Sequence, residues 1–384
     1  MAPTWVNFSY VSLFTLLLAP SVVPVPVAAQ MMGLSTLIII ISSYNAAERE
    51  RKRRRDGDSD PRDVIGRDQA YRFPIVASLA LLGMFLAFKY LPKEWVSFLL
   101  TLYAVSFGGM AFGGVLGGVF ESLHHMPAIC KKQFGLQDYF TFSLCDIVGM
   151  LIAAPVAVWY YKTKMWLPNN ILAASLALSA VDMLAIPDFQ SAAVLLGGLF
   201  VYDIFWVFGS KSVFGSNVMV SVAKQFEGPI KLVFPRFVGA GPKETSMLGL
   251  GDVVIPGLFV ALMLRFDVRK LDLAHSLPSR LPYFVGAVVA YVAGLVATYT
   301  ALTVFDAAQP ALLYLVPSCL LTALVMAAAK KELSELISYT EEHEEGEKGK
   351  PEKTPSGTKE GVKDSEPSTV SSMPEEETES KKDQ

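Results

Sequence analysis

The chain has 384 residues, of which 52% are hydrophobic and 18% are charged, and its mean hydropathy is +0.40. This profile is typical of a membrane protein and excludes an ordinary soluble enzyme. The net charge of -3 carries little information, because basic residues concentrate between 48 and 72. Cys130, Cys145 and Cys319 lie far apart, and with four histidines the chain offers no disulfide framework or metal site. We expect no cofactor, and membrane lipid rather than nucleic acid as a partner.

Nine apolar runs have the length of about 20 residues that crosses a bilayer as a helix. Prolines interrupt the entry to the first run, and residues 11–19 could instead be the apolar part of a signal peptide that ends near residue 29. The sequence therefore predicts an all-α polytopic membrane protein. The predicted spans are 22–44, 73–91, 96–120, 139–161, 168–186, 190–208, 247–265, 283–305 and 311–329.

The distribution of Lys and Arg predicts the orientation, since these residues gather on the cytosolic side of membrane proteins. The densest basic run, 48–72, follows the first span and is placed in the cytosol. An odd number of spans then puts the amino end in the lumen and the carboxyl end in the cytosol. The loop 209–246 disagrees, because it carries five basic residues and falls on the lumenal side. Its length lowers the weight of those charges.

The carboxyl-terminal segment 340–384 contains almost nothing that could form a core, and we predict that it is disordered. It ends in Lys381, Lys382, Asp383 and Gln384. Two lysines at these positions resemble the dilysine signal that retrieves membrane proteins to the endoplasmic reticulum. The pattern therefore favours the endoplasmic reticulum membrane as the location.

Two acidic residues lie in spans that would otherwise suit lipid. Asp203 is in the sixth span, and Asp252 is near the front of the seventh. An ionised acid at the bilayer centre costs at least ~2.5 kcal/mol, so an acid kept there normally faces protein or a water-filled cavity. The alternative is a structural acid that pairs with a neighbouring helix. The sixth, eighth and ninth spans contain no basic residue that could form such an ion pair.

Other acids fit structural roles. Asp146 and Asp182 lie near predicted helix ends, where polar partners are easy to find. Asp267 and Asp306 also lie at helix ends, and we expect them at the membrane interface.

Two acids in adjacent spans without a base are the minimum set for aspartic proteolysis. Carboxyl groups a few ångströms apart cannot both ionise, so they share one proton. One then takes a proton from water while the other gives a proton to the scissile carbonyl.

Gly249 and Gly251 flank Leu250 just before Asp252. These glycines let the backbone loosen and another chain approach closely.

Three motifs in this order resemble those of the GxGD intramembrane aspartyl proteases, most closely the signal peptide peptidase branch of the presenilin-related proteins. They are FVYDIFWVFG (200–209), MLGLGDVVIPG (247–257) and AQPALLYLVP (308–317). A lone GxGD would be a weak signal, but three motifs at the family's spacing are specific. The resemblance implies a nine-span fold and hydrolysis of membrane-spanning peptides, such as leftover signal peptides and type II membrane proteins.

Residue by residue, the resemblance implies that Asp203 and Asp252 are catalytic. It also implies that other motif residues shape the site for substrate, namely Tyr202, Gly249, Leu250, Gly251, Pro310, Ala311 and Leu312.

We divide the chain into an amino-terminal segment (1–30), an amino-terminal bundle (22–186), a catalytic region (187–331) and a cytosolic, mostly disordered tail (332–384).

A proton-coupled transporter is the main alternative, because paired membrane acids also carry protons. Such proteins commonly have two similar halves, and the first four spans contain nothing like the YD or GLGD motifs. An inactive scaffold would gain nothing from two buried carboxylates. Homo-oligomerisation is left open by the sequence.

Overall fold

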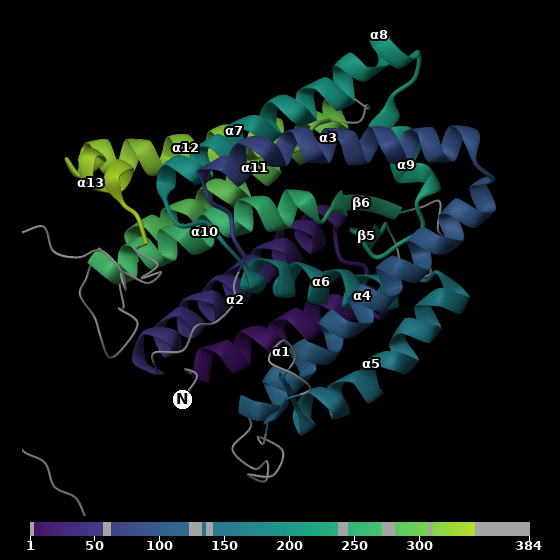
Figure 1. Ribbon diagram of the computed structural model, residues 1–384, viewed down its shortest axis with the longest axis horizontal. Coiled ribbons are helices and arrows are strands. Elements are labelled where there is room, and N and C mark those ends of the chain that lie inside the picture. Colours follow the sequence, from purple (N-terminus) through teal and green to yellow (C-terminus); the bar gives the residue numbers. More distant parts are fainter. Residues whose placement is uncertain are drawn as a thin grey trace, which may run out of the picture. The chain divides into compact units, whose positions relative to one another are not determined.

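The computed structural model describes residues 4–56, 63–122, 133–135, 141–236, 245–270, 281–305 and 309–341, and these are mostly helical. Each predicted span corresponds to one helix, from α2 to α7 and from α10 to α12 (Figure 1). The long helices are α1 (Thr4–Leu18), α2 (Val27–Asp56), α3 (Arg67–Tyr90), α4 (Lys93–Ser122), α5 (Leu144–Thr163), α6 (Trp166–Met183), α7 (Phe189–Ile204), α10 (Gly251–Lys270), α11 (Pro282–Phe305) and α12 (Leu312–Ala329). The shorter ones are η1 (Ala19–Ser21), η3 (Phe205–Gly209), α8 (Ser210–Phe214), α9 (Val218–Gln225) and α13 (Leu333–Ser338).

Three small two-stranded sheets accompany the helices, and the sequence predicted none of them. A parallel pair joins β1 (Asp63–Val64) to β4 (Leu184–Ala185). Antiparallel pairs join β2 (Gln133–Gly135) to β3 (Thr141–Ser143), and β5 (Lys231–Pro235) to β6 (Thr245–Gly249). The predicted fold class, an all-α polytopic membrane protein, is confirmed, and the β5–β6 hairpin is an addition that matters for the site.

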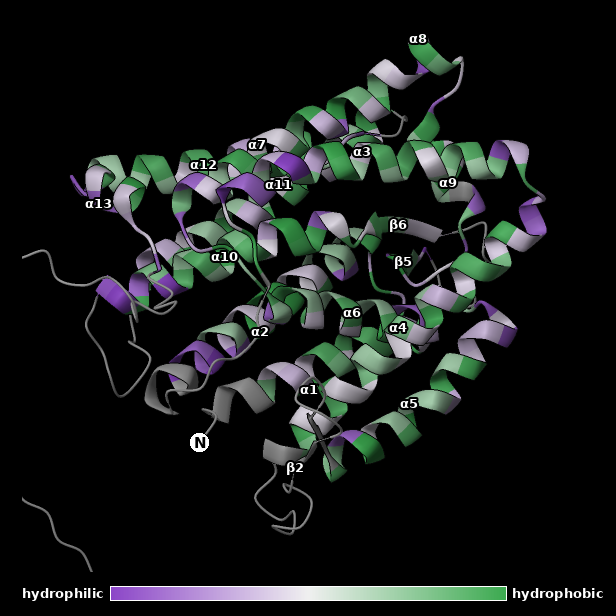
Figure 2. Ribbon diagram, viewed as in Figure 1, coloured by the Kyte–Doolittle hydropathy of each residue, from purple (hydrophilic) through white to green (hydrophobic). Residues whose placement is uncertain are grey.

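Seven helices in the described part of the chain are long and apolar enough to cross a membrane. They are α2, α3, α4, α5, α7 with its continuation, α11 and α12. The two other predicted spans, α6 and α10, are long enough but carry several polar residues, so nine crossings stay a prediction. Figure 2 shows hydrophobic colour along α3 and α4 and hydrophilic residues gathered near helix ends, as at the end of α10.

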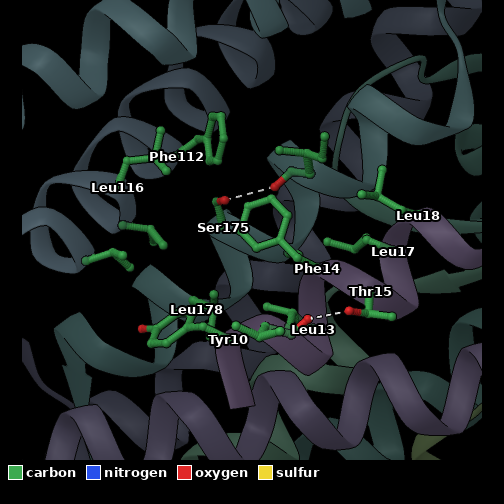
Figure 3. A pocket seen from close by; sticks show the side chains of 15 residues that line it. Tyr10, Leu13, Phe14, Thr15, Leu17, Leu18, Phe112, Leu116, Ser175 and Leu178 are labelled. Atoms are coloured by element: carbon green, nitrogen blue, oxygen red, sulfur yellow. Dashed lines mark hydrogen bonds between the residues drawn. The ribbon is translucent and has the colours of Figure 1, made fainter. Parts of the chain in front are cut away.

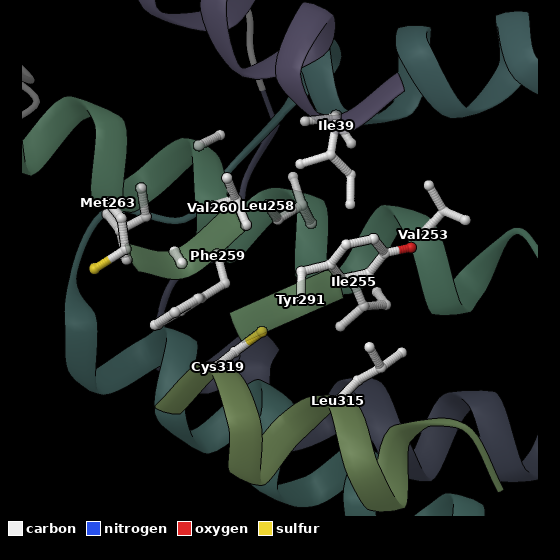
Figure 4. Packing of buried hydrophobic residues seen from close by; sticks show 14 of the residues in the cluster. Ile39, Val253, Ile255, Leu258, Phe259, Val260, Met263, Tyr291, Leu315 and Cys319 are labelled. Carbon is white, nitrogen blue, oxygen red and sulfur yellow. The ribbon is translucent and has the colours of Figure 1, made fainter. Parts of the chain in front are cut away.

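Helix α10 is enclosed by protein, which explains how a polar helix fits this fold. Every residue from 255 to 267 is buried. Helices α2, α6, α7, α11 and α12 all contact it. Phe259 of α10 packs there with Tyr291 of α11 and Cys319 of α12 (Figure 4). Because α10 does not face lipid, its charged residues do not have to enter hydrocarbon.

The amino-terminal segment forms a helix of its own instead of the continuous first span predicted from residue 22. Helix α1 ends before the proline-rich stretch, and α2 begins after it, because proline lacks the N–H that a helix interior needs. Leu13 and Leu17 of α1 are buried in the main core. The Asn45 side chain on α2 donates a hydrogen bond to the Tyr10 hydroxyl at 2.8 Å.

The beginning of the predicted tail is ordered and packs against the helices. After α13, the Glu341 carboxylate accepts hydrogen bonds from Arg265 at 2.7 Å and from the Tyr339 hydroxyl at 3.0 Å. Arg265 also donates to the Ile186 carbonyl at 3.0 Å. The Glu341 N–H donates to the Pro187 carbonyl at 2.8 Å. Residues 339–341, which we call the carboxyl clasp, thus tie the end of α10 to the loop between α6 and α7. Lys381 and Lys382 lie outside the described residues.

We predict that Glu341→Gln lowers the free energy of unfolding by about 3 kcal/mol. The Arg265 and Glu341 side chains are only 5% and 3% exposed, and removing one partner of a buried ion pair leaves the other charge uncompensated. Thermal unfolding in detergent measures the loss. Glu335→Gln is the matched control, because Glu335 pairs with Lys270 at the surface and should contribute at most about 1 kcal/mol. Equal stability of the two variants would contradict the buried pair.

Candidate active site

Asp203 lies near the carboxyl end of α7 and is 2% exposed. Directly after this helix, η3 (Phe205–Gly209) continues as a π-helical turn. Single π-helical turns often occur at functional sites, where they change the direction of side chains. The Asp203 Oδ2 atom accepts a hydrogen bond from the backbone N–H of Leu312 at 3.0 Å. The YD motif and the third motif, 109 residues apart in sequence, therefore meet in the fold.

The third motif forms the amino end of α12. Pro310 and Ala311 are buried just before the helix, which begins at Leu312. Their carbonyls accept the first bonds of the helix, from Leu313 at 3.3 Å and from Leu315 at 3.1 Å. The first N–H groups of a helix have no partner inside the helix, and its dipole favours an anion there. The Leu312 N–H is such a group, and it holds one oxygen of the Asp203 carboxylate in place.

Asp252 lies in the first turn of α10 and is half-buried. The predicted span began at residue 247, but residues 245–249 form β6 instead, so the helix starts at Gly251. Glycine weakens helices, and the strand's backbone pairs with β5. Leu250 is the turn between the two structures, and its carbonyl accepts the N–H groups of Val253 and Val254 at 3.1 and 2.8 Å.

Gly249 lies closely against Asp252. A Cβ atom at Gly249 would come 3.3 Å from the Asp252 Oδ2 atom, whereas one at Gly251 would meet nothing within 4 Å. The first glycine of the motif therefore leaves room for the carboxylate.

The β5–β6 hairpin is anchored to α6 by two buried asparagines that sequence reasoning missed. The Asn170 side chain accepts from the Val233 N–H at 2.8 Å and donates to the Val233 carbonyl at 2.7 Å. The Asn169 side chain donates to the Lys231 carbonyl at 2.8 Å. An amide side chain has both a donor and an acceptor, so Asn170 pairs with β5 as another strand would. The only signal in the sequence was two adjacent amides in an apolar span.

These contacts also determine where the backbone of β6 points. Opposite residues of an antiparallel pair alternate between exchanging both hydrogen bonds and exchanging none. The N–H and carbonyl of Val233 both bond to Asn170, so Val233 exchanges none with Met247, the residue opposite it. The backbone groups of Met247 therefore point away from β5. Gly249 lies two residues further along the strand, so by the same alternation its backbone groups also point away from β5. No further strand pairs with this edge of β6 in the described residues.

The two carboxylates of the first two motifs come together in the fold. Asp203 and Asp252 are close enough to interact electrostatically, and the Tyr202 side chain is within electrostatic range of both. No basic side chain of the described residues forms an ion pair with either acid. By exposed surface, Asp203 is buried and Asp252 is half-buried.

Two other acids singled out in the sequence, Asp182 and Asp267, have contacts within the protein. Asp182 pairs with Arg49 at 2.7 Å. Asp267, which we expected at the membrane interface, is 1% exposed and accepts the Phe284 N–H at 2.8 Å. Its position at the membrane interface stays a prediction, and within the protein α11 covers this end of α10. Asp306 lies outside the described residues.

A cavity of about 450 Å³ between α1, α4 and α6 lies apart from the acids and has a different character (Figure 3). Apolar side chains line most of it, including Phe14, Leu17 and Phe112. The hydroxyls of Thr15 and Ser175 bond to carbonyls of their own helices at 2.8 and 2.9 Å. Among the described residues that line this cavity, none is acidic or basic.

Comparison with known proteins decides the family. Residues 57–343 match the family model described as signal peptide peptidase. The chain belongs to the signal peptide peptidase family. It is 39% identical over 296 residues to the signal peptide peptidase of Homo sapiens, covering 73% of this chain and 75% of that protein. The Mus musculus protein is also 39% identical, over 297 residues, with the same coverage. A probable intramembrane protease of Schizosaccharomyces pombe is 36% identical over 292 residues, covering 76% and 89%.

Membership of the signal peptide peptidase family makes the chain a multi-pass membrane protein and an intramembrane protease. None of these relatives supports the transporter alternative. The family match begins at residue 57, directly after α2, and includes all three motifs. Helices α1 and α2 lie outside it, although α2 packs directly against α10.

We predict that Gly249→Ala lowers the rate of peptide cleavage about tenfold. The new methyl group would displace the Asp252 carboxylate by a few tenths of an ångström, and an error of about 1 Å in a reacting group can cost 10²-fold. Cleavage of a model membrane peptide by the purified variant measures the effect. Gly83→Ala on α3 is the control, because a Cβ there meets nothing within 4 Å. An unchanged rate for Gly249→Ala would mean that the carboxylate tolerates the methyl group.

Proposed function

We propose that the chain is an aspartic endopeptidase of the GxGD type, with Asp203 and Asp252 as its catalytic pair. One observation carries the proposal: α7 and α10, which hold the two carboxylates, contact each other, and no base of the described residues pairs with either acid. Two carboxyl groups in this situation share a proton and act as a coupled pair.

The shared proton supplies both halves of the reaction. One carboxylate takes a proton from a water molecule as the water oxygen bonds to the scissile carbonyl carbon. The other carboxyl gives its proton to the carbonyl oxygen, which forms a tetrahedral intermediate. When the C–N bond breaks, the amine leaves with a proton and a new carboxyl end remains. The Leu312 N–H fixes the orientation of Asp203 during these steps.

A helical substrate must open before it can be cut, because a helix hides its carbonyls in internal hydrogen bonds. The edge of β6 offers a place for the opened segment. The backbone groups of Met247 and Gly249 point toward that edge, and the Met247 residue is 52% exposed. A substrate strand paired there would lie directly before Asp252, held by backbone hydrogen bonds as in other cases of strand addition.

We propose that the substrates are membrane-spanning peptides whose amino ends face the cytosol, such as signal peptides left after signal peptidase and type II membrane proteins. The names of the human and mouse relatives, signal peptide peptidase, support signal peptides as the substrate class. We place the enzyme in the endoplasmic reticulum membrane, with a lumenal amino end and a cytosolic carboxyl end. The basic run after α2 supports the orientation, and Lys381 and Lys382 support the location.

We predict that Asp203→Asn and Asp252→Asn each lower cleavage of a signal-peptide substrate by at least about 10³-fold. An amide can neither share the proton nor accept one from water. Cleavage in detergent by the purified variants measures the loss, and thermal unfolding verifies that they fold. Asp182→Asn is the control, since that acid pairs with Arg49 away from the site. Substantial cleavage by either variant of the pair would refute the aspartic mechanism.

We also predict that Met247→Pro lowers cleavage about tenfold, while Met247→Ala does not. Proline removes the N–H that points toward the substrate, and an edge position tolerates proline because no bond to β5 is lost. Alanine removes the side chain and keeps the N–H. The turnover of both variants, compared at equal folded fraction, separates the effect of the backbone N–H from that of the side chain. Similar rates for proline and alanine would argue against strand pairing at this edge.

A further inference from the structure

A second cavity, of about 250 Å³, lies where the end of α3 and the start of α4 meet α9. Its walls combine two cations, two aromatic rings and two polar side chains. They are Phe85, Phe88, Lys89, Lys93, Ser221 and Gln225. None of the three sequence motifs contributes to it.

The two lysines place positive charge at the edge of this cavity; both are exposed, and the Lys89 Nζ atom lies 5.6 Å from the centre of the Tyr90 ring. Lys89 is in the last turn of α3, and Lys93 is the first residue of α4. Neither forms an ion pair with any described residue. Glu94, the nearest acid in sequence, is exposed. Two like charges on one small cavity repel each other, and an anion between them would turn that repulsion into attraction.

Among the side chains that line the cavity, Gln225 has one acceptor atom without a donor in the described residues. The Gln225 Nε2 atom donates to the Ser221 carbonyl at 3.1 Å. The Gln225 Oε1 atom is buried and has no hydrogen-bond partner among the described residues. A buried acceptor without a donor is costly and is usually satisfied by a ligand or by water. Phe85 and Phe88 add an apolar wall beside it.

We propose that this cavity binds the free carboxyl-terminal end of the peptide substrate. Lys89 and Lys93 hold the terminal carboxylate, and Gln225 accepts the backbone N–H of the last residue. Phe85 and Phe88 pack against that residue's side chain. A peptide end supplies an anion, a donor and an apolar group together, whereas a phosphodiester supplies only the anion. The inference rests on the proposed function, because a signal peptide released by signal peptidase ends in such a carboxylate.

The position of the cavity suits this role, because it lies on the side of the molecule where α7 ends and α10 begins. Phe88 shares a buried cluster with Trp206, which follows Asp203 by three residues. Gln225 precedes Lys231 by six residues, and Lys231 lies opposite Gly249 in the hairpin. Six extended residues span at most ~20 Å. A substrate strand paired with β6 could therefore reach the cavity with its last few residues.

The test compares two synthetic peptides of one signal-peptide sequence, one ending in a carboxylate and the other in a carboxamide. The purified full-length protein in neutral detergent should cleave the acid with a kcat/KM about tenfold higher, mainly through a lower KM, because charge-assisted hydrogen bonds are the strong ones. The Lys89→Gln, Lys93→Gln double variant should lose this preference, and the Lys89→Arg, Lys93→Arg variant should keep it. Lys211→Gln, an exposed lysine on α8, is the matched control and should also keep it.

Each outcome points to one conclusion. Equal cleavage of both peptides by the wild type overturns the carboxylate site, and the proposed function stands if Asp203→Asn and Asp252→Asn are inactive. A preference that survives in the folded glutamine variant places carboxylate recognition elsewhere and overturns the site. A preference that disappears when anionic lipid is added shows that a lipid headgroup displaces the peptide end, which assigns the cavity to lipid and overturns the peptide site. No cleavage of either peptide by the folded wild type counts against the proposed function itself.

Discussion

A carboxylate can stay inside a membrane only where protein and water, rather than lipid, surround it. The rest of this structure depends on that constraint. Helix α10 carries Asp252 at its start and is enclosed by α2, α6, α7, α11 and α12. The same enclosure accommodates Arg265 and Asp267 near its other end, each with partners of its own. A helix on the lipid-facing side of the bundle could hold none of these groups.

The amino end of α10 is where the enclosed helix meets an extended chain. The glycines of the GxGD motif mark the change from strand to helix, and the backbone of β6 needs a partner that the bundle's helices cannot provide. Strand β5 supplies it on one side, and Asn169 and Asn170 hold β5 in turn. This arrangement leaves one edge of β6 directed away from β5, close in sequence to the half-buried Asp252. Rigid anchoring on one side and an accessible edge on the other suit a site that must order a flexible substrate.

Helix ends provide the other support for the pair of acids. The amino end of α12 directs an N–H group to Asp203, and the carboxyl clasp ties α10 to the loop that precedes α7. The two helices that carry the acids are thus connected both beside the site and at the far end of α10. The cavity at α3, α4 and α9 lies on the side of the acids. Lys89 and Lys93 line it and form no ion pair with described residues, so they add positive charge to that side.

The amino-acid sequence alone predicted the helical class, the approximate position of nine apolar segments and the two acids of the proposed catalytic pair. Hydropathy and rare intramembrane carboxylates are local properties, which explains why they could be read directly. Four features became visible only in the folded chain: residues 245–249 form a strand, Asn169 and Asn170 anchor its partner, Asp267 is buried, and Glu341 pairs with Arg265. Each of these features depends on a partner distant in the sequence, and no local pattern indicates which partner the fold will bring.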